Sequence, residues 1–133
     1  MYVKNIILIT HGDLCKGFIS AYDVICGGED ILSAIPLYSE DSPETMAEKI
    51  KTALQGSKAD DFIIIMTDIP AGSTTKSAIP FLYEYKNLYI ISGLNLGMLL
   101  EIALCPFEGD ISETIRHVVE QSKENIQFIN DCL

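Results

Sequence analysis

The sequence predicts an α/β fold: a three-layer sandwich in which an open, mostly parallel, four-stranded sheet carries helices on both faces. Short apolar runs alternate with longer amphipathic stretches, which is the pattern of repeated strand–helix units. The apolar runs are nearly continuous and rich in β-branched residues, as parallel strands buried on both faces are. A length of 133 residues suits one domain, so we expect residues 1–133 to form a single unit.

Four strands are expected, too few for a closed barrel. The predicted strands are Val3–Ile9, Ile31–Leu37, Phe62–Met66 and Leu88–Ile91. In a small sheet of this kind the first strand most commonly lies between the second and the third. The predicted strand order is therefore 2-1-3-4 with right-handed crossovers, and one added antiparallel strand remains open.

The first two helices have start and stop signals in the sequence. An amphipathic stretch begins near Leu14 and is stopped by Gly27-Gly28. In the second helix Ser42 is the expected N-cap, Pro43 takes the first helical position, and Gly56 ends the helix.

The third and fourth helices are shorter. Ser73 is expected to cap a helix that reaches about Tyr83, and Pro80 should bend or shorten it. Another helix follows Asn95 and is terminated by Pro106.

The last long helix is expected to open at Ser112. His117 lies off its apolar stripe and is predicted to be a surface residue. The residues predicted to face inward are Ile115, Val118, Val119, Ile126 and Ile129.

Composition excludes several classes of function. A formal charge of −10 and a pI near 4.4 disfavour binding to nucleic acid, which relies on clustered Lys and Arg, and docking on an anionic membrane. No apolar run approaches the ~18–20 residues that cross a bilayer. No secretory signal is evident, since the apolar run Ile6–Ile9 is too short. We therefore expect a cytoplasmic protein without direct membrane insertion.

The cysteines and histidines do not form a metal-binding pattern. The four cysteines contain no C-x-x-C pair, and neither histidine has metal-ligand spacing to them. Free thiols in a reducing compartment are expected, and no metal is.

Two polar residues follow the first and third predicted strands. The first strand ends in Ile9-Thr10-His11-Gly12, and the third runs into Met66-Thr67-Asp68. Ligands of open α/β sheets bind beyond the carboxyl ends of the strands, where the winding direction reverses. Neighbouring strands lie about 4.8 Å apart. The predicted order therefore brings His11 and Asp68 together at the carboxyl-end edge of the sheet.

A histidine beside a carboxylate suits nucleophilic group transfer. The carboxylate accepts a hydrogen bond from one ring nitrogen, fixes the tautomer and makes the other nitrogen more nucleophilic. Imidazole can then attack a carbonyl carbon or phosphorus. The turn Ala71-Gly72-Ser73 leads into a helix, where backbone N–H groups can stabilise an anion, which favours a phosphoryl group.

Competing chemistries lack their motifs. The sequence contains no G-x-S-x-G, which disfavours a serine hydrolase, and neither a Walker loop nor G-x-G-x-x-G, which disfavours ATP or NAD binding by those routes. Thr10 stands where histidine phosphatases carry arginine.

Three sequence blocks together carry a family resemblance. They are I-L-I-T-H-G-D-L (7–14), M-T-D-I-P-A-G-S (66–73) and G-L-N-L-G-M-L-L-E (93–101). Their order and spacing resemble the mannose-family enzyme IIA components of the bacterial sugar phosphotransferase system (PTS), over nearly the whole chain. After Ser73 the run Thr74-Thr75-Lys76 departs from the Pro-Phe-Asn common in that family, which leaves the sugar and the IIB-docking surface open.

The resemblance implies a cytoplasmic phosphocarrier, usually a homodimer, that needs no cofactor. His11 would accept a phosphoryl group from phospho-HPr and pass it to a separate IIB component, which serves the membrane IIC and IID components in sugar uptake. Asp68 would be the carboxylate that orients the histidine. The residues implied to line the phosphoryl pocket are Thr10, Gly72, Ser73 and Asn95.

Two alternatives stay open beside the phosphocarrier. One is the IIA-like subunit of a PTS-dependent dihydroxyacetone kinase, which shares the fold and the histidine. The other is a non-catalytic regulatory module that senses the phosphorylation state of the system.

Overall fold

Four parallel strands form the central sheet of the computed structural model, which describes residues 1–27, 30–58 and 61–133. The strands are β1 (Ile6–His11), β2 (Leu32–Leu37), β3 (Ile63–Thr67) and β4 (Leu88–Ser92). Their order is β2-β1-β3-β4, which confirms the prediction. No antiparallel strand joins this sheet within the described residues.

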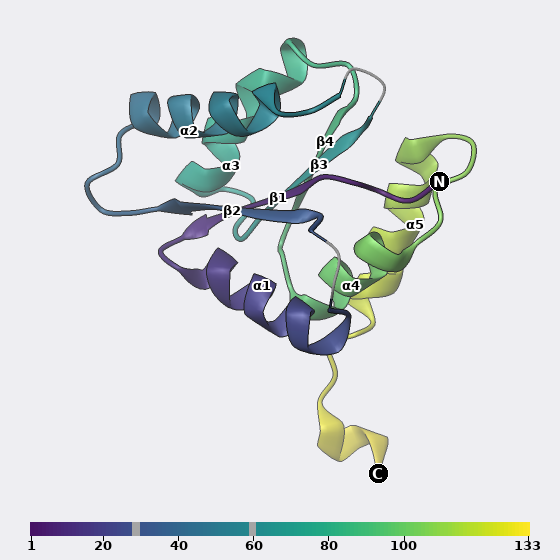
Figure 1. Ribbon diagram of the computed structural model, residues 1–133. Helices are drawn as coiled ribbons and strands as arrows, with labels where there is room; N and C mark the ends of the chain where they lie inside the picture. Colours follow the sequence, from purple (N-terminus) through teal and green to yellow (C-terminus); the bar gives the residue numbers. More distant parts are fainter. Residues whose placement is uncertain (28–29, 59–60) are drawn as a thin grey trace.

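Helices cover both faces of the sheet and complete the predicted three layers (Figure 1). On one face lie α1 (Leu14–Ile25), α4 (Leu96–Leu104) and α5 (Ile111–Lys123). On the other face lie α2 (Pro43–Gln55), α3 (Ser73–Ala78) and the 3-10 helix η1 (Ile79–Tyr83).

Alternate residues of each strand serve the two faces. In β1, Ile6 and Leu8 pack into the core that α1, α4 and α5 share, whereas Ile7 and Ile9 pack into the core under α2 and η1. All four side chains are fully buried. Because both faces are covered, the strand is apolar at successive positions, which is the signal that predicted a parallel sheet.

The start of α2 has the predicted cap. The Ser42 hydroxyl accepts a hydrogen bond from the Thr45 N–H (3.1 Å), and the Thr45 hydroxyl accepts one from the Ser42 N–H (2.9 Å). This reciprocal capping box satisfies two backbone donors that the helix itself leaves free. Pro43 takes the first helical position and Gly56 is the C-cap, both as predicted.

The start of α3 corrects the sequence prediction. Gly72, not Ser73, is the N-cap, with an extended backbone (φ −85°, ψ 171°), and Ser73 is already helical. The α-helix ends at Ala78, and Pro80 lies in the 3-10 turn that follows, so the predicted shortening by proline is confirmed.

The end of α1 shows how the chain leaves that helix. Cys26 is the C-cap, and Gly27 adopts a left-handed conformation (φ +47°) directly after it. Glycine favours this conformation, because it has no Cβ to clash with the backbone. The predicted stop also included Gly28, which lies outside the described residues.

The last helix and the chain end depart most from prediction. Asp110 is the N-cap of α5 and accepts a hydrogen bond from the Ser112 N–H (2.9 Å), so the helix opens one residue before Ser112. Val118 is buried as predicted, but Ile126 and Ile129 are 83% and 60% exposed. The inward prediction was wrong for both because α5 ends at Lys123.

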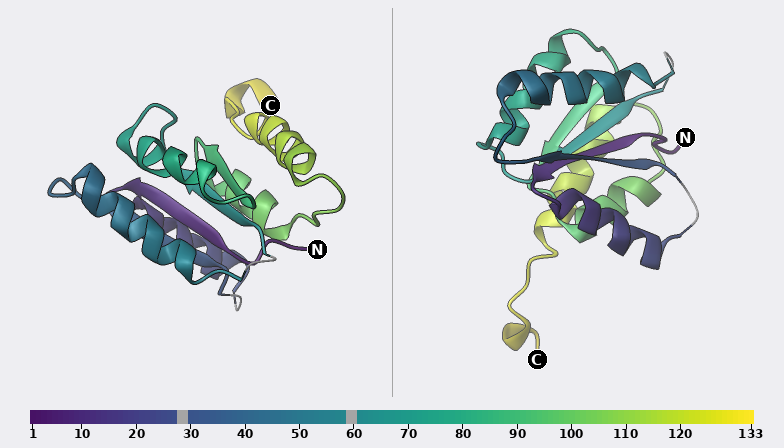
Figure 2. Two further views of the ribbon diagram at one scale, coloured as in Figure 1. Left: turned by 90° about the horizontal axis from the view of Figure 1, so that it is seen from above. Right: turned by 60° about the vertical axis from the view of Figure 1, so that its left-hand side comes forward.

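Residues 124–133 form a C-terminal arm that runs away from the sandwich and ends in the 3-10 helix η2 (Ile129–Cys132) (Figure 1; Figure 2, right). All four cysteines are free thiols, as expected. Among the described residues, no helix has both the length and the apolar composition needed to cross a membrane.

Candidate functional site

The structure joins His11 and Asp68 at the carboxyl-end edge of the sheet. His11 is the last residue of β1, and Asp68 directly follows β3, the strand that pairs with β1. The imidazole Nδ1 lies 2.8 Å from the Asp68 Oδ2, and the His11 backbone N–H donates to the same oxygen over 2.8 Å. The parallel pairing of β1 and β3 therefore fixes both ends of this contact.

The second carboxylate oxygen of Asp68 has partners of its own. Its Oδ1 accepts hydrogen bonds from the Ile69 N–H (2.9 Å) and from the Thr74 hydroxyl (2.7 Å). Burial raises the pKa of Asp68, but the hydrogen bonds from His11 and Thr74 outweigh it and hold the pKa below its usual range. Asp68 is therefore ionised at neutral pH and acts only as an acceptor.

The ionised carboxylate decides the tautomer of His11. Because Asp68 can only accept, the Nδ1 must carry the proton in their hydrogen bond, and the Nε2 of the neutral ring keeps its lone pair. The His11 side chain is 46% exposed while that of Asp68 is 9% exposed. The arrangement therefore joins a half-exposed imidazole to an orienting carboxylate that is largely shielded from solvent.

Gly72 lies against the imidazole ring. A Cβ built at Gly72 would stand 3.2 Å from the His11 Cε1 and 3.5 Å from the Ile69 Cβ. Glycine at this position lets the turn before α3 approach the ring closely.

Thr10 shapes the turn between β1 and α1. Its side chain is fully buried, and its hydroxyl accepts a hydrogen bond from the Cys15 N–H (2.8 Å) and donates to the Gly12 carbonyl (3.3 Å). Gly12 has a left-handed backbone (φ +56°) and donates its N–H to the Leu37 carbonyl. The Thr10 hydroxyl is therefore engaged inside the turn that follows His11.

Ser73, the first residue of α3, and Asn95, the N-cap of α4, both have local partners. Ser73 is exposed, and its carbonyl accepts a hydrogen bond from the Ser77 hydroxyl (2.8 Å). The Asn95 side-chain oxygen caps α4 by accepting from the Met98 N–H (3.0 Å), and its amide group donates to the Gly93 carbonyl (3.3 Å). The loop before α4 is tied to the site strand, since the Gly93 N–H donates to the Thr67 carbonyl (3.0 Å).

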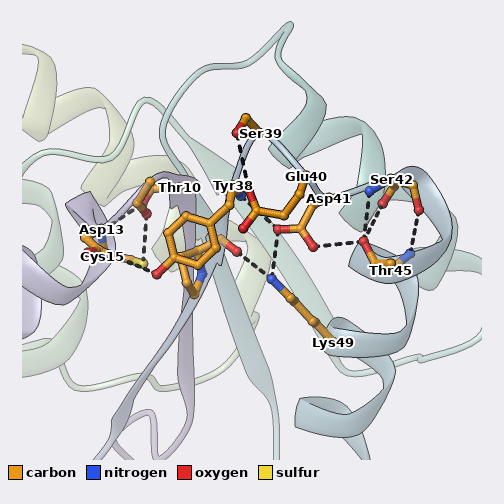
Figure 3. A network of polar contacts seen from close by, with 12 residues as sticks. Thr10, Asp13, Cys15, Tyr38, Ser39, Glu40, Asp41, Ser42, Thr45 and Lys49 are labelled. Carbon is orange, nitrogen blue, oxygen red and sulfur yellow. Dashed lines mark hydrogen bonds and ion pairs between the residues drawn. The ribbon is translucent and has the colours of Figure 1, made fainter.

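Sequence reasoning missed a polar network that joins the loops after β1 and β2 (Figure 3). The Tyr38 hydroxyl donates to the Asp13 carboxylate, and Lys16 donates to the Tyr38 oxygen (3.3 Å). Lys16 also pairs with Asp13 (3.6 Å), so its charge is shared with a carboxylate in this loop cluster. The hydrogen bond from Tyr38 is the largest influence that lowers the pKa of Asp13.

The same network continues to α2 through Asp41. The Tyr38 N–H (2.8 Å) and the Thr45 hydroxyl (2.8 Å) donate to the Asp41 carboxylate, which also pairs with Lys49 (2.9 Å). These groups, the Tyr38 N–H first, lower the pKa of Asp41 to about 2. Lys49 in addition donates to the Pro36 carbonyl (3.0 Å). The Asp41 carboxylate thus connects the loop after β2 to Thr45 and Lys49 of α2.

Buried hydroxyl groups also link the ends of β3, α3 and β4. Thr75 donates to the Ile69 carbonyl (2.8 Å), its oxygen lies 2.7 Å from that of Thr67, and Thr67 donates to Ser92 (2.7 Å). The T-D-I-P-A-G-S-T-T run carries a high density of hydroxyl side chains, which is the one signal in the sequence that could have drawn attention to these contacts.

An open parallel α/β sheet with a carboxylate-oriented imidazole at its switch point has a geometry suited to group transfer on histidine. The family model described as "PTS system fructose IIA component" (EIIA-man) matches residues 5–127, and the chain belongs to this family. It is thus a sugar-specific EIIA component of the phosphotransferase system, and the family implies partners such as HPr and a IIB component.

Individual relatives agree with the family in fold and length. The fructose-specific EIIA component of Bacillus subtilis (strain 168) is 23% identical over 129 residues, which cover 97% of this chain and 88% of the relative. The EIIA component of Streptococcus agalactiae has a TM-score of 0.85 at 25% identity and covers 96% of this chain and 98% of its own. The mannose/sorbose-specific IIA subunit of Enterococcus faecalis has a TM-score of 0.86 at 20% identity and covers 96% of this chain and 95% of its own.

Proposed function

We propose that this chain is a phosphocarrier, which accepts a phosphoryl group from phospho-HPr on His11 and passes it to a IIB component in the cytoplasm. The observation that carries the proposal is the 2.8 Å contact between the His11 Nδ1 and the ionised Asp68. That contact leaves the Nε2 of the half-exposed ring free to bond to phosphorus. The fold and family support the same assignment, because the pair lies at the switch point of an EIIA domain.

The proposed step is an in-line displacement at phosphorus. The Nε2 lone pair of His11 forms the new N–P bond while the N–P bond of phospho-HPr breaks, and the departing imidazole of HPr takes the electron pair of that bond. Asp68 stabilises the positive charge that develops on the His11 ring through its hydrogen bond to Nδ1–H. The second transfer repeats the displacement, with a nucleophile of the IIB component attacking the phosphoryl group on His11.

The surroundings of His11 support a site for a transient phosphoryl group. Gly72 leaves the space beside the imidazole open, where a Cβ would stand 3.2 Å from the His11 Cε1. We assign Thr10 the task of holding the turn after β1, because its hydroxyl is already paired there. Ser73, exposed at the start of α3, and Asn95, on the loop tied to β3, are proposed to line the outer pocket. The proposed transfer uses no metal and no cofactor.

Surface charge supports a basic partner. The chain carries a formal charge of −10, and Asp13 and Glu40 are exposed on the loops that follow β1 and β2. Charge complementarity accelerates association and is screened by salt. We expect phosphate uptake from HPr to slow as the salt concentration rises, measured as initial rates from 50 to 500 mM salt (roughly 14 to 4 Å of screening length).

The C-terminal arm supports the proposal of a homodimer. Its apolar side chains Ile126, Phe128 and Ile129 are 83%, 67% and 60% exposed, so the part of the chain that the structure describes leaves them largely uncovered. An apolar arm that extends from a folded domain is suited to packing on a second copy of the chain. Sedimentation at micromolar concentration should give a dimer that Phe128→Ser weakens, and a monomeric wild-type protein would refute this part of the proposal.

The decisive experiment is phosphorylation with enzyme I, HPr and labelled phosphoenolpyruvate. The protein should acquire an acid-labile, alkali-stable phosphate, as expected for phosphohistidine. His11→Ala should abolish labelling, and His117→Ala is the matched control because His117 is exposed on α5, away from the site. Labelling of His11→Ala would overturn the site assignment.

The second half of the experiment separates transport from its alternatives. Discharge of the phosphoprotein by a IIB component supports the phosphocarrier, and discharge only by a dihydroxyacetone kinase supports the IIA-like subunit of that system. A phosphoprotein that neither acceptor discharges supports a regulatory module.

A further inference from the structure

We propose that Thr74 is a positioning residue of the phosphoryl-transfer site, acting through Asp68. The Thr74 hydroxyl donates to the Asp68 Oδ1 over 2.7 Å. The inference deepens the proposed function and rests on it, since it assigns a role in the reaction of His11.

The burial of Thr74 makes this hydrogen bond obligatory. Its side chain is fully buried at the second position of α3, so water does not offer an alternative acceptor. A hydroxyl in such a place normally pairs with a protein group, and here the acceptor is the carboxylate itself. Hydrogen bonds to an ionised acceptor are stronger than those between neutral groups.

The two oxygens of Asp68 have separate tasks. Oδ2 accepts from the His11 N–H and from the imidazole Nδ1–H, whereas Oδ1 accepts from Ile69 and Thr74. Ile69 is the next residue in the chain and moves with Asp68, so it restrains the carboxylate weakly. Thr74 belongs to α3 and provides a fixed external point, which prevents the carboxylate plane from turning and releasing the imidazole.

Thr74 also connects His11 to α3 by a second route. Gly72, two residues earlier, lies so near the ring that an added Cβ would stand 3.2 Å from the His11 Cε1. The start of α3 therefore lies beside the imidazole and holds its carboxylate partner. Among the described residues, His11 is the titratable group that contacts Asp68. The loss of the Thr74 hydroxyl should therefore alter the pKa of Asp68 and the tautomer of His11.

Thr75 provides a matched control. It is the next residue, it is also buried (7% exposed), and its hydroxyl is also hydrogen-bonded. Its partners are the Ile69 carbonyl and the hydroxyl groups of Thr67 and Ser92 rather than the Asp68 carboxylate.

The test compares Thr74→Val, Thr74→Ser and Thr75→Val by NMR and by kinetics. In Thr74→Val the 13C titration of Asp68 should give a higher pKa, because a donor to the carboxylate is lost. The imidazole 15N shifts should report a mixture of tautomers in place of one dominated by Nδ1–H. Phosphate uptake from phospho-HPr should slow by roughly tenfold, the size expected for a lost hydrogen bond to a charged group.

Thr74→Ser should restore all three readouts, and Thr75→Val should leave the tautomer and the pKa of Asp68 at wild-type values. Wild-type NMR readouts in Thr74→Val would overturn the inference. If Thr74→Val does not fold, Thr74→Ala is judged by the same criteria. Failure of the wild-type protein to take up phosphate would refute the proposed function, whereas the NMR signals would still decide whether Thr74 fixes Asp68.

Discussion

Two loops at the carboxyl-end edge of the sheet each hold an aspartate, and they use it for different purposes. Asp41, after β2, binds a backbone N–H, a threonine hydroxyl and Lys49. Asp68, after β3, binds backbone N–H groups, a threonine hydroxyl and His11. Both carboxylates accept hydrogen bonds from backbone N–H and threonine hydroxyl groups. They differ in the remaining side chain, which is the Lys49 ammonium for Asp41 and the His11 imidazole for Asp68.

The partner decides what each aspartate does. Lys49 has a fixed charge and also donates to the Pro36 carbonyl, so it anchors the loop to the sheet. His11 uses one nitrogen for Asp68, and its side chain is 46% exposed. Asp41 therefore stabilises the loop, because Lys49 is hydrogen-bonded to groups of the protein. Asp68 instead orients an imidazole whose second nitrogen has no such bond among the described residues.

Exchanging each aspartate for asparagine gives the largest expected contrast. Asp68→Asn should lower the rate of phosphate uptake by on the order of 10²-fold, because a neutral amide no longer stabilises the charge developing on the imidazole. Asp41→Asn should keep a rate near that of the wild type. Initial rates with phospho-HPr, accompanied by circular dichroism to verify folding, provide the measurement. An unfolded Asp68→Asn would make this carboxylate structural like Asp41, and equal rates in both variants would remove the distinction.

Crowding the imidazole should have the next largest effect. In Gly72→Ala the new methyl group would stand about 3.2 Å from the His11 Cε1, so the ring must shift away from its aligned position. We expect phosphate uptake to fall by about tenfold, since small misplacements of a reacting group cost rate steeply. Gly17→Ala is the control, because a Cβ at Gly17 in α1 meets nothing within 4 Å. A wild-type rate in Gly72→Ala would show that the ring has freedom to adjust.

The main features of the fold and the central pair were predictable from the sequence. Continuous apolar strands and the rule for ligand sites in open sheets placed His11 beside Asp68. The loop network was not predictable, because Tyr38 and Asp13 are 25 residues apart and meet only after β1 and β2 have paired. A contact of this kind depends on the exact exit of two loops, for which hydrophobic periodicity carries no information.

Two errors have local physical causes. Serine is a favoured N-cap, but Gly72 adopts the extended backbone of the cap, so Ser73 becomes the first helical residue. The periodic isoleucines after Lys123 looked like a continuing buried stripe. In the structure the helix ends at Lys123, and these isoleucines are exposed on the C-terminal arm.

The free energy of unfolding should depend more strongly on acidic pH in the wild-type protein than in Asp41→Asn. The folded-state pKa of Asp41 is about 2, below an unfolded value of about 3.9. A lowered carboxyl pKa stabilises the fold above the unfolded value, and this contribution is lost as the pH falls from about 4 toward about 2. Urea unfolding at a series of pH values should show a steeper loss of stability in this window for the wild type than for Asp41→Asn. Parallel curves would mean that Asp41 is not held by these hydrogen bonds in solution.

The smallest expected effect concerns the cap that follows Asp41. Ser42→Ala removes the acceptor for the Thr45 N–H and should lower the free energy of unfolding by about 1 kcal/mol, the usual cost of an N-cap serine. The change in Tm should be modest, and phosphate uptake should stay at the wild-type rate, because the capping box steadies α2 without touching His11. Thr52→Ala is a suitable control, since its hydroxyl bonds only within α2, to the Glu48 carbonyl. If Ser42→Ala stays folded but takes up phosphate more slowly than the wild type, the loop after β2 takes part in transfer or docking. The loops that hold Asp41 and Asp68 would then share a function.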